Sequence, residues 1–188
     1  MKKYLLFTVP AIAGLVSCTA PADPAAEKMM ADHMAMMKAD SAADATAAAA
    51  RECFLKVAAM FESGSTEGIE GCVAENFIEH QPAPGITTTG IQGLKDVVAM
   101  HHGAFPDTKM TIVSSAMEGD MMYVHFNMKG TNTGAMGPDM PATGKAIDVN
   151  GMDVLRFENG KAVEHWGYWE EVKMMTQLGM MPAPGEGH

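Results

Sequence analysis

The chain has 188 residues, of which 47% are hydrophobic and 19% are charged, a composition typical of a folded globular domain rather than a disordered chain. Its formal net charge of −10 would repel a phosphate backbone, so nucleic acid is not an expected partner. No apolar run reaches the roughly 18 residues that a transmembrane helix needs.

The N-terminus has the pattern of a secretory signal, because Lys2-Lys3 precede the apolar stretch Tyr4–Val16. This stretch leads through Ser17 into Cys18, and the junction resembles the bacterial lipobox, in which the cysteine is lipidated and becomes the first mature residue. We therefore expect a lipoprotein signal peptide over residues 1–17 and a lipid anchor on Cys18. The protein would lie in the cell envelope as a periplasmic or cell-surface lipoprotein. The alternative is a plain secretory signal with an unrelated cysteine.

Residues 18–46 are rich in alanine, aspartate and methionine, and we interpret them as a partly helical tether. Five methionines surround His33 between Met29 and Met37. Thioether and imidazole groups are soft ligands that suit copper(I). The alternative, which we favour on sequence grounds, is an alanine-rich helix whose methionines lie against another surface.

The folded domain is expected over residues 47–180, followed by a disordered tail at 181–188. Helical spacing of Phe54, Val57 and Phe61 predicts a helix over 47–62. Ser65 or Thr66 can cap a second, shorter helix that runs to about Glu75.

Cys53 and Cys72 lie at similar distances from the turn at Gly64, one on each arm of this expected helical hairpin. Their side chains could meet, and a disulfide persists outside the cytoplasm. The alternative is a pair of buried free thiols.

A short strand is expected over 76–81, then a turn-rich loop, then a helix over 91–104. Helical spacing places His101 and Phe105 on the inward face of this helix. Four strands are expected to follow, over 109–117, 121–130, 145–157 and 161–170, with a terminal helix over 171–179. The long connection 131–144 has the character of a binding loop.

This order indicates an α+β fold, in which one curved antiparallel sheet wraps over three N-terminal helices to form a cone with an interior pocket, followed by a short C-terminal helix. Several segments between about Arg51 and Gly179 resemble the SnoaL-like polyketide cyclases, also called ester cyclases, of the nuclear transport factor 2-like superfamily. The matching segments are 76–80 (NFIEH), 104–107 (AFPD), 130–134 (GTNTG), 141–145 (PATGK), 159–161 (NGK), 164–166 (EHW) and 177–179 (QLG).

The resemblance implies a deep pocket for a small organic ligand, commonly a homodimer, and acid/base chemistry without a metal or cofactor. In the cyclases, an aspartate on the last strand is the acid/base and a histidine on the neighbouring strand assists it. The aspartate position falls on Gly167, which has no side chain, and the histidine position falls on Asp153. A pocket asparagine of the family falls on His80.

Asp153 and His165 are the candidate catalytic pair. A three-residue loop, Glu158-Asn159-Gly160, would put them opposite each other, whereas a two-residue loop, Asn159-Gly160, would turn His165 to the other face. We prefer the three-residue loop because it lets the two family positions share a face. His165 would then act as the base and Asp153 would orient it.

The expected function is a small-molecule pocket with cofactor-free cyclisation, isomerisation or hydrolysis through Asp153 and His165. The alternative is a non-catalytic surface module that binds a ligand, since Gly167 lacks the cyclase acid; a third interpretation makes the pair structural. The expected ligand is small and partly apolar. The residues expected to line its pocket are His80, Gln81, His101, Phe105, Gly151 and Gly167.

No metal is expected, because His80, His101 and His165 lie on three separate elements without a close-spaced ligand pair. The opposite face of the last two strands carries Met152, Val154, Trp166 and Tyr168. A second subunit is the simplest cover for this face, which predicts a homodimer. The alternative is that Trp166 and Tyr168 pack against the chain's own tail.

Overall fold

The structure is a computed structural model that describes residues 24–137 and 139–182. The expected signal peptide, Cys18 and residues 183–188 of the expected tail lie outside the described residues. The chain divides into two compact units, with the boundary between Asp40 and Ser41. Within the described ranges, no helix combines the length and the apolar character needed to cross a membrane.

The first helix, α1, runs from Pro24 to Ser63 and so takes in both the described part of the expected tether and the expected helix over 47–62. Pro24 suits the first position of a helix, and the alanine-rich sequence after it contains no glycine. Gly64 ends the helix with a left-handed φ of 73°, and its N–H donates to the carbonyl of Met60 at 2.7 Å.

The expectation of a second helix that runs to about Glu75 is wrong. Only a single 3-10 turn, η1, forms at Ile69–Gly71, and the chain enters strand β1 at Val73. Gly68 before the turn has a left-handed φ of 77°, which a continuing helix would not allow. Val73, which was expected to lie within this helix, instead pairs with Ala162 in the last strand of the chain.

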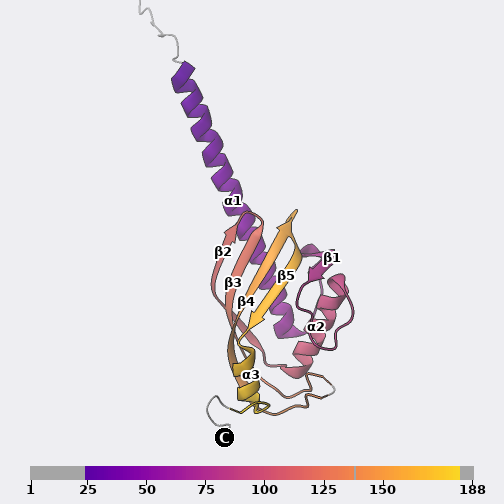
Figure 1. The fold of residues 1–188 in the computed structure, drawn as a ribbon. Coiled ribbons are helices and arrows are strands. Elements are labelled where there is room, and N and C mark those ends of the chain that lie inside the picture. The colour runs from indigo at the N-terminus through magenta and orange to yellow at the C-terminus, as the bar shows by residue number, and fades with distance from the viewer. Residues whose placement is uncertain (1–23, 138, 183–188) are drawn as a thin grey trace, which may run out of the picture. The chain divides into compact units, whose positions relative to one another are not determined.

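Among the described residues, five strands form one mixed sheet in the order β1-β5-β4-β3-β2 (Figure 1). Strands β2 to β5 pair antiparallel, whereas β1 runs parallel to β5. The sheet was expected to be antiparallel throughout, and the parallel pairing of β1 corrects this expectation. The fold is α+β. The remaining elements are β1 (Val73–Glu79), α2 (Gly90–Ala104), β2 (Lys109–Glu118), β3 (Met121–Thr131), β4 (Ala146–Glu158), β5 (Lys161–Trp169) and α3 (Glu171–Leu178).

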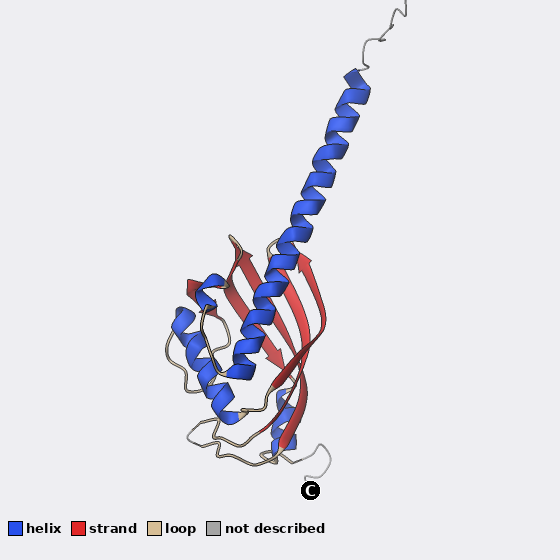
Figure 2. Cartoon of the chain, turned by 180° about the vertical axis from the view of Figure 1, so that it is seen from behind, coloured by secondary structure: helices blue, strands red, loops and turns tan. Residues whose placement is uncertain are grey.

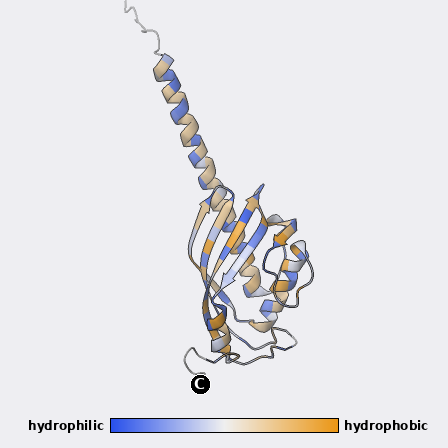
Figure 3. Cartoon of the chain, viewed as in Figure 1, coloured by the Kyte–Doolittle hydropathy of each residue, from blue (hydrophilic) through white to orange (hydrophobic). Residues whose placement is uncertain are grey.

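The core lies between the sheet and the helices that cover one of its faces, α2 and the part of α1 after Ser41 (Figure 2). Alternate side chains of β3 are buried there, including Val124 and Phe126, so Tyr123 and His125 face outward. The ring of Phe126 contacts Phe54 of α1 at a centroid distance of 6.5 Å. Hydrophobic positions accordingly recur along the strands and on the helices (Figure 3).

A disulfide joins Cys53 of α1 to Cys72, the residue after η1, with a Cα–Cα distance of 5.2 Å. The sequence left open whether these two cysteines form a disulfide or stay as free thiols, and the structure has the disulfide. The second arm is a 3-10 turn rather than a helix, so the expected geometry of a helical hairpin is wrong even though the two residues meet.

Candidate functional site

A cavity of about 650 Å³ opens between the sheet and the helices, within the unit that begins at Ser41. Its lining is mainly apolar and rich in aromatic and methionine side chains, among them Phe77, Phe105 and Met140. The loop between β3 and β4 contributes Met136 and Met140 to the wall. The polar side chains on the wall are few, and those that bear on the chemistry are Glu79, Gln81, His101, Asp153 and His165.

Three of these polar groups form a row on adjacent strands. His165 of β5 lies between two carboxylates, with Nδ1 at 2.6 Å from Oε2 of Glu79 on β1 and Nε2 at 3.1 Å from Oδ1 of Asp153 on β4. All three side chains are partly buried, with exposed fractions of 20% for His165, 26% for Glu79 and 13% for Asp153. Both ring nitrogens of His165 are therefore engaged.

The two carboxylates set the charge of His165. Burial alone would favour the neutral ring, but the contacts with Asp153 and Glu79, and the negative charges of both, outweigh burial and raise the pKa of His165 to about 10. The imidazole is thus an imidazolium at neutral pH and has no lone pair with which to accept a proton. To act as the expected base, His165 would first have to lose this proton, so its role as base stays a prediction.

A β-bulge brings Asp153 and His165 to the same face. Glu158 pairs with Lys161, and Asn159 and Gly160 both have positive φ (50° and 76°), so the turn is the two-residue loop and not the preferred three-residue loop. The register then shifts, because Arg156 pairs with Glu164 while Phe157 pairs with Ala162, which leaves Val163 as the extra residue. Asp153 lies opposite Gly167, and His165 is its diagonal neighbour.

Gly167 packs closely against the pair. A Cβ built on Gly167 would lie 3.0 Å from Cε1 of His165 and 3.5 Å from Oδ1 of Asp153. The N–H of Gly167 donates to Oε1 of Gln81 at 2.6 Å, which fixes the Gln81 side chain at the cavity wall. The position where the cyclases carry their acid therefore faces Asp153 and His165.

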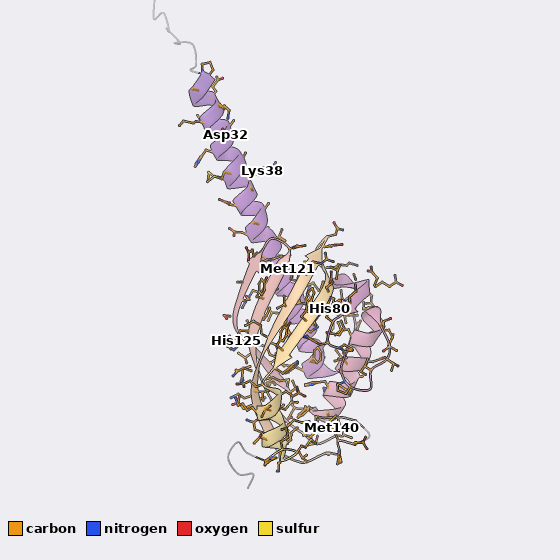
Figure 4. All side chains as sticks on the ribbon, viewed as in Figure 1. Asp32, Lys38, His80, Met121, His125 and Met140 are labelled. Carbon is orange, nitrogen blue, oxygen red and sulfur yellow. A yellow bond between two sulfur atoms is a disulfide. The ribbon has the colours of Figure 1, made fainter. Side chains whose placement is uncertain are left out.

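His80 does not belong to the cavity, contrary to expectation. Its ring stacks on Trp166 at a centroid distance of 4.2 Å, and its Nε2 lies 2.8 Å from Oε2 of Glu164, on the other face of the sheet (Figure 4). Glu79 takes the place in the cavity instead. Strand alternation in the sequence could have found it, because Phe77, Glu79 and Gln81 share one face and His80 cannot share a face with Gln81.

His101 and Phe105 line the cavity as expected. The Nε2 atom of His101 is 3.0 Å from Oγ1 of Thr108, and its ring contacts Phe61 and Phe105. Burial, with a smaller contribution from neighbouring His102, lowers the pKa of His101 to about 4. At neutral pH, His101 is therefore uncharged, whereas His165 carries a positive charge.

Gly151 was expected to leave room for a ligand. It faces inward, but it does not leave that room. A Cβ built on it would lie 2.4 Å from Cζ of Phe126, so the ring of Phe126 already fills this space. As for metals, in the part of the chain that the structure describes, no group of three or more His, Cys, Asp and Glu side chains is arranged to hold an ion.

Solved structures share this fold. TsrD from Streptomyces laurentii aligns with a TM-score of 0.65 at 20% identity, over 71% of this chain and 97% of its own. IdmH from Streptomyces antibioticus, a candidate polyketide cyclase, aligns with a TM-score of 0.60 at 23% identity, over 69% and 98%. A candidate polyketide cyclase from Bacillus cereus aligns with a TM-score of 0.58 at 26% identity, over 70% and 79%.

No curated protein sequence matches this chain. The sequence pattern of the SnoaL-like polyketide cyclases, in contrast, matches residues 51–178, which span the disulfide, the whole sheet and the cavity. The chain therefore belongs to the SnoaL-like polyketide cyclase family.

Proposed function

We propose that the domain binds a small, partly apolar carbonyl compound and catalyses proton transfer at the carbon beside the carbonyl, without a cofactor. The observation that carries this proposal is the Glu79–His165–Asp153 row on the wall of an otherwise apolar cavity. A volume of about 650 Å³ suits a ligand of two to four fused or linked rings, since ligand pockets span roughly 300–1,000 Å³.

Asp153, rather than His165, is the base in this proposal. His165 is protonated at neutral pH, whereas the carboxylate of Asp153 has lone pairs to offer. Although Oδ1 of Asp153 lies at ion-pair distance from His165, it accepts no well-aligned hydrogen bond from any described residue. Asp153 also lines the cavity beside the closely packed Gly167, so its carboxylate is within reach of a bound substrate.

The reaction starts when Asp153 takes a proton from the substrate carbon. The C–H bond breaks, and its electron pair moves onto the carbonyl oxygen to give an enolate. The positive charge of His165, kept in place by Glu79, stabilises the developing negative charge. In an isomerisation, Asp153 returns the proton to another carbon. In a cyclisation, the enolate carbon attacks a second carbonyl of the same molecule, and the proton passes to the new alkoxide.

The proposal can be tested with 2-tetralone, a bicyclic ketone with a benzylic α-carbon and a size that suits the cavity, by following deuterium uptake at its α-carbons in D2O by NMR. The wild-type protein should accelerate this exchange over buffer. Asp153→Asn should lower the acceleration by about 10²–10⁴-fold, the usual contribution of a general base. The fluorescent phenol 2-naphthol, which resembles the enolate, should still bind the variant, because an amide in place of the carboxylate preserves the shape of the cavity.

Asp148→Asn is the matched control, since Asp148 is on the same strand and is exposed to solvent outside the cavity. It should leave exchange unchanged. Equal exchange rates in wild-type protein and Asp153→Asn would contradict the proposed base.

The second candidate function is a non-catalytic ligand-binding module. It is favoured by Gly167, which lacks the side chain that the cyclases use, and by the engagement of both nitrogens of His165. Binding of 2-naphthol by the wild-type protein without any acceleration of 2-tetralone exchange would support this function over catalysis.

We also propose that Cys18 is lipidated and anchors the domain to a membrane of the cell envelope, on the basis of the basic start and apolar stretch before it. Two or more acyl chains would hold firmly, since each buried methylene contributes about 0.8 kcal/mol. Incorporation of labelled palmitate in the native cell should be lost in Cys18→Ser; unchanged labelling would contradict the anchor.

Finally, we propose a homodimer formed through the outer face of the sheet, where Tyr123, Met152 and Tyr168 are exposed. Trp166 is already covered in part by the ring of His80. Sedimentation of the protein should show a dimer, and Met152→Asp should shift it to a monomer; a monomeric wild-type protein would contradict this assembly.

A further inference from the structure

The segment Met29–Met37 of α1 carries a methionine cluster that plays no part in the core. The five methionines of this segment are all well exposed, with exposed fractions from 60% to 74%. Methionine is normally filler of apolar interiors, so five exposed copies within nine residues call for another explanation. The sequence-based preference, that these side chains lie on another surface, stays a prediction. The cluster consists of Met29, Met30, Met34, Met36 and Met37.

Helix geometry places His33 at the centre of this cluster. Residues three and four positions apart are neighbours on a helix surface. All four such neighbours of His33 are methionines, at i−4 (Met29), i−3 (Met30), i+3 (Met36) and i+4 (Met37). Because successive residues are turned by about 100°, these four, His33 and Met34 fall within an arc of about 160°.

The charged side chains nearest in sequence lie off this face. Lys28 and Asp32 form an i,i+4 ion pair with each other at 2.7 Å, and helix geometry puts both outside the arc of the cluster. The exposed face around His33 thus offers one imidazole and several neutral thioethers. The nearest carboxylate on the same face, Asp40, lies a turn beyond Met36 and adds a negative charge that favours a cation.

We propose that this face is a binding site for a soft monovalent cation, Cu(I). Thioether sulfur with one imidazole nitrogen is a donor set that selects Cu(I) over the harder divalent ions. His33 with Met36 and Met37 (i, i+3, i+4), or with Met29 and Met30, supplies two sulfurs and one nitrogen from a single helix face. The flexible methionine side chain lets the sulfurs converge on one ion without distortion of the helix. The site is independent of the cavity chemistry.

The test is anaerobic titration of the full chain in detergent micelles with Cu(I), in competition with the chromogenic chelator bicinchoninate. Free thiols are alkylated beforehand, and the Cys53–Cys72 disulfide leaves neither of its sulfurs as a thiol ligand. One Cu(I) per chain is expected at a dissociation constant of micromolar or below. His33→Ala should weaken binding at least 10-fold. Replacement of Met29, Met30, Met36 and Met37 together by leucine should abolish it.

Leucine keeps both the volume and the helix propensity of methionine, so circular dichroism should show that the quadruple variant retains its helix. The matched control is Met152→Leu with Met181→Leu, two exposed methionines outside the cluster, which should bind as the wild-type protein does. Ag(I), which is redox-inert, should give the same order of variants by calorimetry. The proposal is overturned if the wild-type chain takes no Cu(I) from the chelator, or if the quadruple leucine variant binds as tightly as wild type.

Discussion

His165 is held between two carboxylates that come from different strands. With Glu79 at 2.6 Å and Asp153 at 3.1 Å, the cost of burying a cation is outweighed by its two partners. The charge of the ring therefore depends on both neighbours at once. This dependence distinguishes the row from a surface ion pair, which would shift a pKa little.

Removal of one carboxylate should reveal this coupling. In Glu79→Gln, the pKa of His165 should fall from about 10 by roughly 1–3 units, because one negative charge within hydrogen-bond distance is lost. The measurement is the titration of the imidazole carbon and nitrogen signals by NMR. His101 is the internal control and should continue to titrate near 4. A wild-type His165 that titrates near 6.5 would contradict the structure of the row.

At the scale of elements, the hairpin of β4 and β5 sets the site. Its two-residue turn alone would place His165 on the face away from Asp153, and the extra residue at Val163 returns it to the cavity. Further along β4, Gly151 lets the ring of Phe126 cross the strand and pack against Trp169 at a centroid distance of 5.3 Å. The hairpin thus forms both a wall of the cavity and part of the core.

The close packing at Gly151 leads to a stability prediction. In Gly151→Ala, the new methyl group would overlap the fully buried ring of Phe126, so the free energy of unfolding should fall by about 1–3 kcal/mol. Urea denaturation measures this change. Gly103→Ala is the matched control, because a Cβ at Gly103 meets no atom within 4 Å and alanine favours a helix by up to about 1 kcal/mol. Equal effects of the two substitutions would contradict the packing.

At the scale of the whole molecule, two histidines with opposite shifts shape the dependence of stability on pH. The pKa of His165 is raised above its unfolded value, so its contribution is fully present below about 6.5 and is lost as pH rises through 10. The pKa of His101 is lowered, so its contribution is present above about 6.5 and is lost as pH falls through 4.

The free energy of unfolding should therefore be greatest near pH 6.5 and decline on both sides. Urea unfolding at a series of pH values from about 4 to about 10 measures the curve. Relative to wild type, His165→Gln should flatten the decline on the alkaline side, and His101→Gln should flatten the decline on the acid side. The three proteins share the same carboxylates, so the comparison with wild type cancels the contribution of those groups. A wild-type stability that rises between about pH 7 and about pH 10 would contradict the charged state of His165.

Much of the fold could be predicted because it rests on local patterns. Helical spacing predicted α2 and the second part of α1, alternation predicted the last four strands, and Asn159-Gly160 marked the hairpin turn. Those strands also placed Asp153 and His165 together, though through the wrong register. The prediction of a second helix was wrong, because the residues expected at its end belong to β1 and pair with β5.

The sequence by itself determined the α+β order, the family, and the chemical types available to the site, since these follow from local periodicity and short motifs. Only the tertiary structure decided which of those groups meet. Glu79 lies 86 residues from His165 and becomes its partner through the parallel pairing of β1 with β5, a contact that no local pattern specifies. The same long-range pairing, with the bulge at Val163, turns His165 from an expected base into a cation held between two acids.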